Sequence, residues 1–299
     1  MEKILILGAT GRIVGLAADI IYNANPASLR VATSREAGLA SLRDRYPGAE
    51  VVQADWYDPA SLGPAMAGVS RVLVVTPDWV TDESVVTPNI IAAAKMAGSI
   101  RLLVRMLANP PGGTVDDVPP EFLATGVGAA HHLVAKPLLD ASGLPICYVN
   151  VPAWFMSNLA WFAAAEVKAK RQIGFPAALD ADRMWVSEHD IAAVMARTLM
   201  EPVARHVGKE YFLTSERYRF TDIARTFSEQ LGEPVAYVDD GSTMRETFGE
   251  EGYNKLLVYM RTEGWLYGAV PHRETIAELL GRPQQTLGGY IGANLEDYR

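Results

Sequence analysis

Short apolar segments alternate with amphipathic ones over the first half of the chain. The apolar segments are rich in Val, Ile and Leu on both faces, which is typical of strands buried inside a parallel sheet. Because helical patterns separate them, their order predicts an α/β fold, namely a doubly wound parallel sheet with helices on both faces. The expected strands are residues 3–7, 29–33, 51–53, 71–76, 102–106 and 146–151, and the expected helices are residues 13–22, 38–46, 60–66, 89–97 and 131–141.

The chain opens with a strand, a glycine turn and a helix, because Gly8-Ala9-Thr10-Gly11 follows the first apolar segment without a gap. This arrangement points backbone N–H groups and the positive end of a helix dipole at a phosphate. Gly8 permits the tight turn, and Gly11 lets the backbone approach a pyrophosphate without an intervening Cβ. An ordinary strand-to-helix turn is the alternative. The turn predicts a Rossmann-type dinucleotide site made by Gly8, Thr10, Gly11, Arg12 and Ile13.

The usual glycine spacing of such a turn is broken at one position. A third glycine is expected at position 14, where the chain has Val14, and Gly15 follows one residue later. The third glycine serves close packing between helix and strand more than contact with phosphate. Val14 therefore predicts a slightly displaced first helix without removing the site.

After residue 152 the alternation ends, which predicts a second part of different construction. We expect a helix over residues 156–170, strands at 211–214 and 234–238, and a mainly helical tail over 244–280. A further helix at 221–231 is expected to begin behind a Thr N-cap and to end at Gly232. The expected domains are a Rossmann domain at 1–152 and a smaller, interleaved α+β substrate-binding part at 153–299, of which residues 186–214 return to the core sheet.

Composition limits the partners of the chain. A net charge of −8 and a pI near 5.2 argue against nucleic acid, because binding phosphate backbones needs a basic face. No apolar run reaches the roughly 18 residues of a membrane span, and the start of the chain leaves no room for a signal peptide. Cys147 is the single cysteine and is expected to be a buried small hydrophobe, which fits the reducing cytoplasm. The oligomeric state stays open between monomer and homodimer.

The residues after the second expected strand indicate which dinucleotide binds. Enzymes that use NAD place Asp or Glu there, on the ribose 2′-hydroxyl. Here Ser34 and Arg35 precede the first acid, Glu36, and an arginine fork is well matched to a 2′-phosphate. This predicts NADP(H), with an exposed arginine in a turn as the alternative. Asp55, after the third expected strand, is expected to accept a hydrogen bond from the adenine amino group or else to cap the helix near residues 59–66.

With these residues in place, the chain resembles the NmrA-like group of atypical short-chain dehydrogenase/reductases over nearly its whole length. The resemblance is carried, in order, by residues 8–11, 52–55, 142–145, 152–158, 190–193, 213–214 and 231–234 with Tyr237. Residues 72–77 further resemble the branch that contains NAD(P)H azo and quinone reductases. The resemblance implies NADP(H) in the crevice at the carboxyl ends of the strands, with Thr76, Pro77, Pro152 and Trp154 beside the nicotinamide.

The catalytic residues of ordinary short-chain dehydrogenases are missing, because no Tyr stands four residues before a Lys. The corresponding segment contains His132 and Lys136, which share one helix face at this spacing. Relatives often have Glu where Lys136 stands, so Lys136 would restore the cation that holds the nicotinamide ribose. His132 would then supply a proton near neutral pH. A solvated His-Lys helix face is the equal alternative, and neighbouring His131 is expected to be exposed.

Aromatic and soft side chains near the expected nicotinamide position predict a pocket for a flat, apolar substrate. Relatives commonly carry Arg where Val151 stands, so this pocket is less cationic than theirs. Arg105 would either compensate for that loss or form a surface salt bridge. The expected substrate residues are Trp79, Trp154, Phe155 and Met156. A place in the core is the alternative for Phe155, Met156 and Phe162, and we expect it for at least half of these three.

These features predict an NADPH-dependent reductase that transfers hydride to an azo compound, a quinone or a conjugated imine. A positioned nicotinamide and exclusion of water suffice for that transfer, and solvent can supply the protons. The alternative is a catalytically silent, NADP(H)-sensing regulatory protein of the NmrA type, which the missing tyrosine favours. No metal is expected, because the sequence presents too few convergent His and carboxylate ligands.

Overall fold

The computed structural model describes residues 2–299, which form two compact units. The first unit comprises, within the described residues, 2–109, Gly128–Asn150 and Ile191–Phe212. The second comprises Pro110–Val127, Val151–Asp190 and Leu213–Arg299. The chain therefore passes from one unit to the other several times, and each unit is described separately below.

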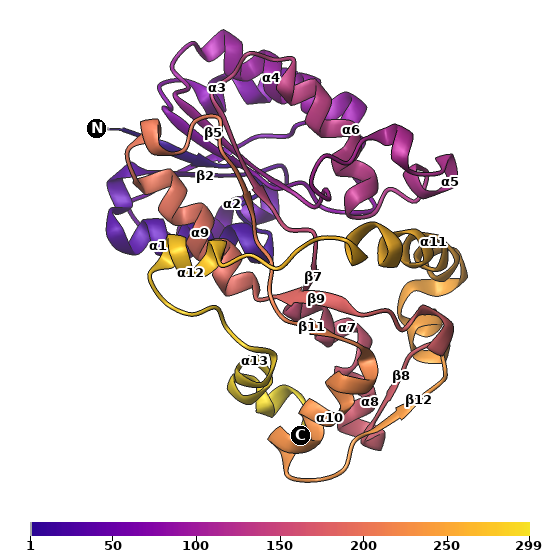
Figure 1. The fold of residues 1–299 in the computed structure, drawn as a ribbon. Coiled ribbons are helices and arrows are strands. Elements are labelled where there is room, and N and C mark those ends of the chain that lie inside the picture. Colours follow the sequence, from indigo (N-terminus) through magenta and orange to yellow (C-terminus); the bar gives the residue numbers. More distant parts are fainter. Residues whose placement is uncertain (1) are drawn as a thin grey trace. The chain divides into compact units, whose positions relative to one another are not determined.

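The first unit is built on a parallel sheet of 7 strands in the order β10-β6-β5-β4-β1-β2-β3 (Figure 1). Strand β1 pairs with β2 on one side and with β4 on the other, so the strand order reverses beside β1. In such sheets ligands bind at the carboxyl ends of the strands next to this reversal. The strands are β1 Ile4–Ile6, β2 Leu29–Thr33, β3 Glu50–Gln53, β4 Arg71–Val74, β5 Leu102–Leu107, β6 Ile146–Asn150 and β10 Glu210–Phe212. The predicted doubly wound α/β fold is confirmed.

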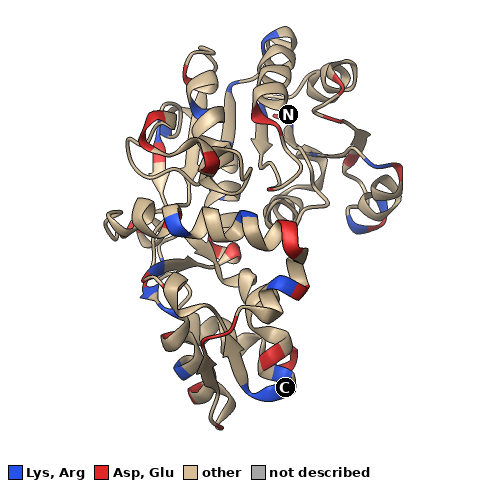
Figure 2. Ribbon diagram, turned by 90° about the vertical axis from the view of Figure 1, so that its right-hand side faces the viewer, with Lys and Arg blue, Asp and Glu red and all other residues tan. Residues whose placement is uncertain are grey.

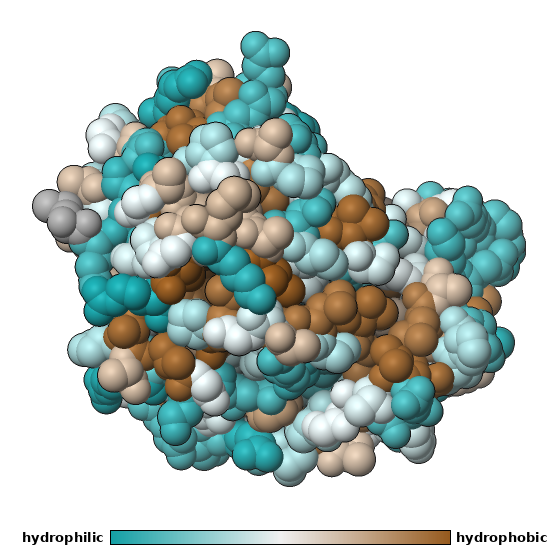
Figure 3. Space-filling view, turned by 90° about the horizontal axis from the view of Figure 1, so that it is seen from above, coloured by the Kyte–Doolittle hydropathy of each residue, from teal (hydrophilic) through white to brown (hydrophobic). Residues whose placement is uncertain are grey.

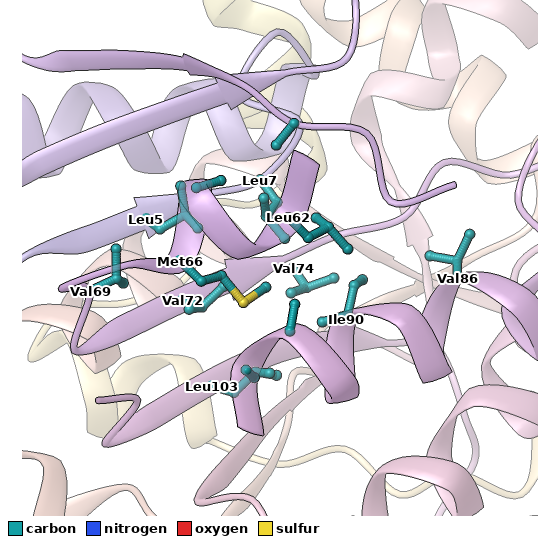
Figure 4. Close-up of a cluster of buried hydrophobic side chains, with 14 of the residues drawn as sticks. Leu5, Leu7, Leu62, Met66, Val69, Val72, Val74, Val86, Ile90 and Leu103 are labelled. Carbon is teal, nitrogen blue, oxygen red and sulfur yellow. The ribbon is translucent and has the colours of Figure 1, made fainter. Parts of the chain in front are cut away.

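Helices cover both faces of this sheet (Figure 1). The helices of the first unit are α1 Arg12–Ala24, α2 Glu36–Arg45, α3 Pro59–Met66, α4 Glu83–Ala97 and α6 Ala129–Asp140, together with most of α9 Glu188–Met200. Figure 4 shows side chains of α3 and α4, among them Leu62 and Ile90, over Leu5, Val72 and Leu103 of the strands. Each such buried side chain contributes roughly 1.5–3 kcal/mol, so this layer fixes the strand ends that carry the candidate site.

The second unit contains two small sheets and several helices. One sheet has the order β11-β9-β7, and the other joins β12 to β8 in parallel. The strands are β7 Trp154–Phe155, β8 Gln172–Gly174, β9 Arg183–Val186, β11 Arg217–Tyr218 and β12 Ala236–Val238. The helices are α5 Pro120–Leu123, α7 Leu159–Phe162, α8 Ala164–Lys170, α10 Phe220–Leu231, α11 Ser242–Gly268, α12 Thr275–Leu280 and α13 Leu287–Ala293.

Local expectations differ from the structure at a few helix ends. The single helix expected over residues 156–170 is wrong, because a 3₁₀ turn at Met156–Asn158 and non-helical Ala163 divide it into short pieces. The Thr N-cap expected for α10 is also wrong. The cap is Arg219, whose backbone N–H donates to the Asp222 carboxylate at 3.1 Å. The expected end at Gly232 is confirmed, with φ of 73°.

Charged residues are mixed on the molecule. In the view of Figure 2, Lys and Arg alternate with Asp and Glu along the helices, without an extended basic stripe in that view. Figure 3 shows that apolar residues also reach the surface in several groups, the most extended of them to the right of the centre in that view. Within residues 2–299, the structure contains no helix with the length and apolar character of a membrane span.

Candidate functional site

The turn between β1 and α1 has the geometry expected of a dinucleotide-binding turn. Gly8 has φ of +69°, a value that other residues rarely adopt. A Cβ at Gly8 would also lie 3.3 Å from the ring of Trp56, so a side chain there would require the indole to shift slightly. The N–H of Gly11 donates to the carbonyl of Gly8 at 2.8 Å and closes the turn.

The N-terminus of α1 is open to an anion. Its N-cap is Gly11, no described side chain caps it, and its first turn holds no acidic residue. Helices α3 and α4 differ, because Asp58 and Asp82 accept hydrogen bonds from their first turns. The first N–H groups of a helix need a partner, and a phosphate is the ligand that suits them. The 13-residue helix α1 thus fits the diphosphate of a dinucleotide.

Gly15 follows the position of the missing third glycine and lies near the turn. A Cβ at Gly15 would lie 3.4 Å from the carbonyl oxygen of Ala9, which is an ordinary van der Waals contact. The Tyr46 hydroxyl donates to the carbonyl of Gly15 at 3.2 Å. Val14 is buried beside it.

Ser34 and Arg35 lie exposed at the end of β2, next to β1 in the sheet. Arg35 is the N-cap residue of α2, and the Ser34 carbonyl accepts a hydrogen bond from Gln53 of β3 at 3.1 Å. This bond holds the backbone at Ser34, and Arg35 is exposed to solvent. A 2′-phosphate could therefore bind there.

Asp55 follows β3 and is held by a local turn. Its Oδ1 accepts a hydrogen bond from the N–H of Tyr57 at 2.9 Å. The helix-capping alternative for Asp55 is wrong, because Asp58 accepts the N–H of Ala60 at the start of α3.

A buried ion pair stands beside the end of β4. Arg105 of β5 and Glu83 of α4 each have side chains only 1% exposed, and the guanidinium donates to the carboxylate. The Thr76 hydroxyl donates to Glu83 at 2.6 Å and accepts from Arg105 at 2.8 Å. Burial alone would raise the pKa of Glu83, but the charge of Arg105, with His132 and bonds from Thr76 and Thr87, lowers it to about 2.

This pair corrects the expectation of a surface salt bridge for Arg105 and engages the hydroxyl of Thr76. Arg105 is not in a surface salt bridge, since the pair lies inside the first unit. The Thr76 hydroxyl is already engaged on both sides, so a bound cofactor would meet the Thr76 backbone rather than its hydroxyl. The sequence signal for the pair is an arginine in the middle of an apolar strand, which rarely stays buried without an acid.

His132 of α6 is buried and uncharged. It is 3% exposed, and neither ring nitrogen has a hydrogen-bond partner among the residues that the structure describes. Burial, helped by the charge of Arg105, lowers the pKa of His132 to about 3. The ring is therefore neutral at pH 7, which argues against the interpretation of His132 as an acid near neutral pH. His131, expected to be exposed, is buried as well.

Lys136 is engaged by acids rather than by His132. Its ammonium group lies 2.9 Å from Asp140 and 3.8 Å from Glu210. It also sits 4.7 Å from the centre of the Tyr148 ring, whose hydroxyl donates to Asp140. Burial raises the pKa of Tyr148, so this tyrosine is not an activated acid. A ribose contact by Lys136 would compete with both carboxylates.

The loop after β4 holds a residue in an unusual conformation. Trp79 has φ of 71°, where a bulky residue is a genuine outlier, and its side chain is 42% exposed. Such a conformation costs on the order of 1–3 kcal/mol and persists where the surrounding structure imposes it. Pro77 in the same loop is exposed.

In the second unit, the expected cofactor and substrate residues lie mainly in an aromatic core. Trp154 is buried, packs 5.1 Å from the Phe162 ring, and donates to Glu263 at 3.1 Å. Glu263 in turn pairs with buried Arg183 at 2.9 Å, an ion pair that sequence reasoning missed. Pro152 and Met156 are buried, whereas Phe155 is partly exposed. The core alternative is thus confirmed for Met156 and Phe162, and Trp154, for which it was not expected, is buried as well. Across the part of the chain that the structure describes, no group of His, Cys, Asp and Glu could hold a metal ion.

Comparison with known proteins extends these findings. A sequence model of the NmrA-like family matches residues 1–262. Quinone oxidoreductase 2 of Escherichia coli K12 is 27% identical over 290 residues, covering 95% of this chain and 96% of that protein. The NAD(P)H azoreductase of Xenophilus azovorans is 27% identical over 304 residues, covering 97% of each.

Solved structures give the same picture. The NADPH complex of an NADPH-dependent quinone oxidoreductase from Escherichia coli is 25% identical, with a TM-score of 0.77 over 98% of this chain and 99% of that one. NmrA, a negative transcriptional regulator solved with NADP, is 17% identical with a TM-score of 0.75 over 99% and 97%. The similarity to NmrA shows a shared fold and nothing further.

Proposed function

Because this chain belongs to the NmrA-like family, we propose that it is an NADPH-dependent reductase that acts on a small aromatic acceptor. The observation that carries the proposal is the uncapped N-terminus of α1 behind the Gly8 turn, with exposed Arg35 at the end of the next strand. Relatives of nearly equal length are a quinone reductase and an azoreductase, which favours quinones and azo compounds as acceptors. Conjugated imines share their flat, electron-poor character.

The first unit supplies the cofactor-binding residues of this proposal. The first-turn N–H groups of α1, from Arg12 and Ile13, bind the diphosphate, with Gly8, Thr10 and Gly11 forming the turn. Ser34 and Arg35 bind the 2′-phosphate, and Asp55 accepts a hydrogen bond from the adenine amino group. The backbone at Thr76 and Pro77 lies beside the nicotinamide half. Bound NADPH supplies the hydride.

The proton that accompanies hydride transfer comes from water in this proposal. His132 is neutral and buried, and Lys136 is neutralised by Asp140 and Glu210. Reduction of a quinone or an azo bond does not need a protein acid, because the reduced oxygen or nitrogen is basic enough to take its proton from solvent. The ion pair of Arg105 and Glu83 keeps the end of β4 rigid beside the reacting ring.

A regulatory function is the second candidate. The missing Tyr-x-x-x-Lys motif and the engaged Lys136 favour a protein that senses NADP(H) without chemistry. The reductase is better supported, because the two reductase relatives are 27% identical to this chain, whereas the NmrA regulator is 17% identical. We further propose that the protein works in the cytoplasm, where its single thiol, buried Cys147, stays reduced.

One experiment separates these functions. Calorimetry first measures binding of NADPH and NADH, and a panel of quinones, azo dyes and imines is then tested for oxidation of NADPH by loss of its absorbance. Turnover with any acceptor supports the reductase. Tight binding of NADPH without turnover across the panel would favour the regulator. No binding of either dinucleotide would refute both.

A further inference from the structure

We propose that Trp79 forms a wall of the adenine site, with its indole stacked on the adenine ring of the bound dinucleotide. This inference rests on the proposed function. In that proposal Asp55 alone contacts the adenine ring, and Trp79 is added here as a second adenine-binding residue. The sequence predicted that Trp79 contacts the substrate, whereas this inference assigns Trp79 to the cofactor site.

The first observation is the backbone of Trp79. Among residues 2–299, only Trp79 and Arg171 are non-glycine residues with positive φ. Arg171 ends helix α8 in the left-handed conformation that is common at helix C-termini. Trp79 stands in the loop between β4 and α4, where no helix end accounts for its conformation. Strain of this kind concentrates at ligand-binding positions.

The second observation is how firmly the loop is held on both sides of Trp79. Before it, the Asp78 carboxylate accepts the N–H of Gly128 at 2.9 Å. After it, the Tyr57 hydroxyl donates to the Val80 carbonyl at 3.0 Å and accepts the N–H of Asp82 at 2.6 Å. These bonds hold the loop in the conformation that imposes the strain, and the indole remains partly in solvent.

The third observation places the second half of this loop, Val80 to Asp82, beside the segment that follows β3, whereas Thr76 and Pro77 belong to its first half. Tyr57 binds the loop through its hydroxyl, while its own N–H donates to the Asp55 carboxylate. Trp56 lies against Gly8 at the diphosphate turn. In doubly wound sheets the adenosine half of a dinucleotide lies over the first three strands and the nicotinamide half over the later ones. The bonds of Tyr57 therefore draw Trp79 toward β3 and away from the acceptor.

The surface around Trp79 suits a flat base. Tyr57 and Val80, which are joined by the bond from the Tyr57 hydroxyl to the Val80 carbonyl, are both exposed, and Val80 is 68% exposed. Aromatic faces bind bases by stacking, which is favourable for any purine and needs no hydrogen bonds. Asp55 would add a hydrogen bond at the ring edge. An exposed rim with a polar acceptor beside it is the composition expected of an adenine site.

The test compares Trp79→Ala with the unmodified protein for three ligands: NADPH, adenosine 2′,5′-bisphosphate and reduced nicotinamide mononucleotide. We expect affinity for the first two to fall about tenfold, because both contain adenine. Affinity for the mononucleotide and the KM of a quinone at saturating NADPH should not change. Trp161→Ala removes another exposed indole, from the second unit, and should leave all values unchanged.

Stability of a second variant checks the strain itself. Because φ is positive at position 79, Trp79→Gly should melt at a higher temperature than Trp79→Ala, the reverse of the usual order for these residues. Unchanged affinity of Trp79→Ala for adenosine 2′,5′-bisphosphate would overturn the inference, as would a raised quinone KM with unchanged nucleotide affinity. Failure of the unmodified protein to bind either adenine ligand would instead refute the proposed function.

Discussion

The guanidinium of Arg105 and the carboxylate of Glu83 form an ion pair that is almost completely buried. The pair lies beside the end of β4, next to the proposed cofactor site. Burying two charges is costly, and their attraction offsets that cost only when the geometry is good and further hydrogen bonds are made. Thr76 and Thr87 supply such bonds to the carboxylate. The pair thus links β5, β4 and α4 at one point.

Removing one partner of this pair should destabilise the protein strongly. Glu83→Gln leaves the Arg105 charge buried without a counterion, and we expect the free energy of unfolding to fall by about 3–5 kcal/mol. Urea denaturation measures the change. Glu296→Gln, which breaks an exposed pair with Arg299, should cost at most about 1 kcal/mol. A double variant, Glu83→Gln with Arg105→Met, should recover part of the loss. A single variant as stable as the unmodified protein would contradict this account of the pair.

The buried neutral state of His132 predicts an acid-sensitive fold. Its pKa falls from an ordinary value of 6.5 to about 3 on folding, because burial disfavours the charged ring. The unfolded chain therefore binds a proton below pH 6.5 that the folded protein does not, and stability must fall as the pH drops. Glu83 contributes in the same direction at lower pH, between its ordinary value of 4.5 and about 2.

The two groups can be separated by the pH window of each. His132→Gln should flatten the dependence of the unfolding free energy between pH 6.5 and 4.5, measured by urea denaturation at fixed ionic strength. His272→Gln, at a partly exposed histidine of the second unit, should keep the slope of the unmodified protein. Equal slopes for all three proteins would mean that His132 is not the group responsible. His132→Gln should not change the pH profile of turnover near neutrality, because His132 does not titrate there.

The sheet could be predicted from the sequence because its signals are local. Apolar segments such as residues 29–33 are continuous in the chain, and Gly232 ends its helix through its own backbone preference. The Gly8 turn was predictable for the same reason. The ion pair of Lys136 with Asp140 could also be predicted from the sequence, since the two residues are spaced i and i+4 on one helix.

The chemistry of the site was less predictable because it depends on distant residues. His132 shares a helix with Lys136, yet its charge state follows from Arg105 and from burial that no local pattern reveals. Trp154 was expected beside the cofactor, but pairing of β7 with β9 places it in an aromatic core with Trp185. Trp79 was noticed as an aromatic residue, whereas its backbone strain requires coordinates.

The Gly8 turn should tolerate a side chain poorly. Gly8→Ala places a Cβ 3.3 Å from the Trp56 ring and forces alanine to a φ of +69°. We expect a loss of stability of roughly 1–2 kcal/mol from the backbone conformation, together with loss of NADPH binding in calorimetry. Gly48→Ala is a matched control, because Gly48 also has positive φ but has nothing within 4 Å of an added Cβ. It should lose similar stability and keep its NADPH affinity. Retained binding by Gly8→Ala would be evidence against a diphosphate at this turn.

The choice of cofactor should depend on Arg35. Its guanidinium lies exposed at the end of β2, where the ribose of a bound dinucleotide would lie. Charge-assisted hydrogen bonds to a phosphate contribute about 1.5–3 kcal/mol, so Arg35→Ala should weaken NADPH binding by roughly ten- to a hundredfold. NADH lacks the 2′-phosphate, so its binding should change little, and calorimetry with both dinucleotides gives the ratio. Arg43→Ala removes another exposed charge from the same helix, α2, and controls for the general loss of positive potential. Equal losses for NADPH and NADH would show that Arg35 does not read the phosphate, since a specific contact must discriminate between them.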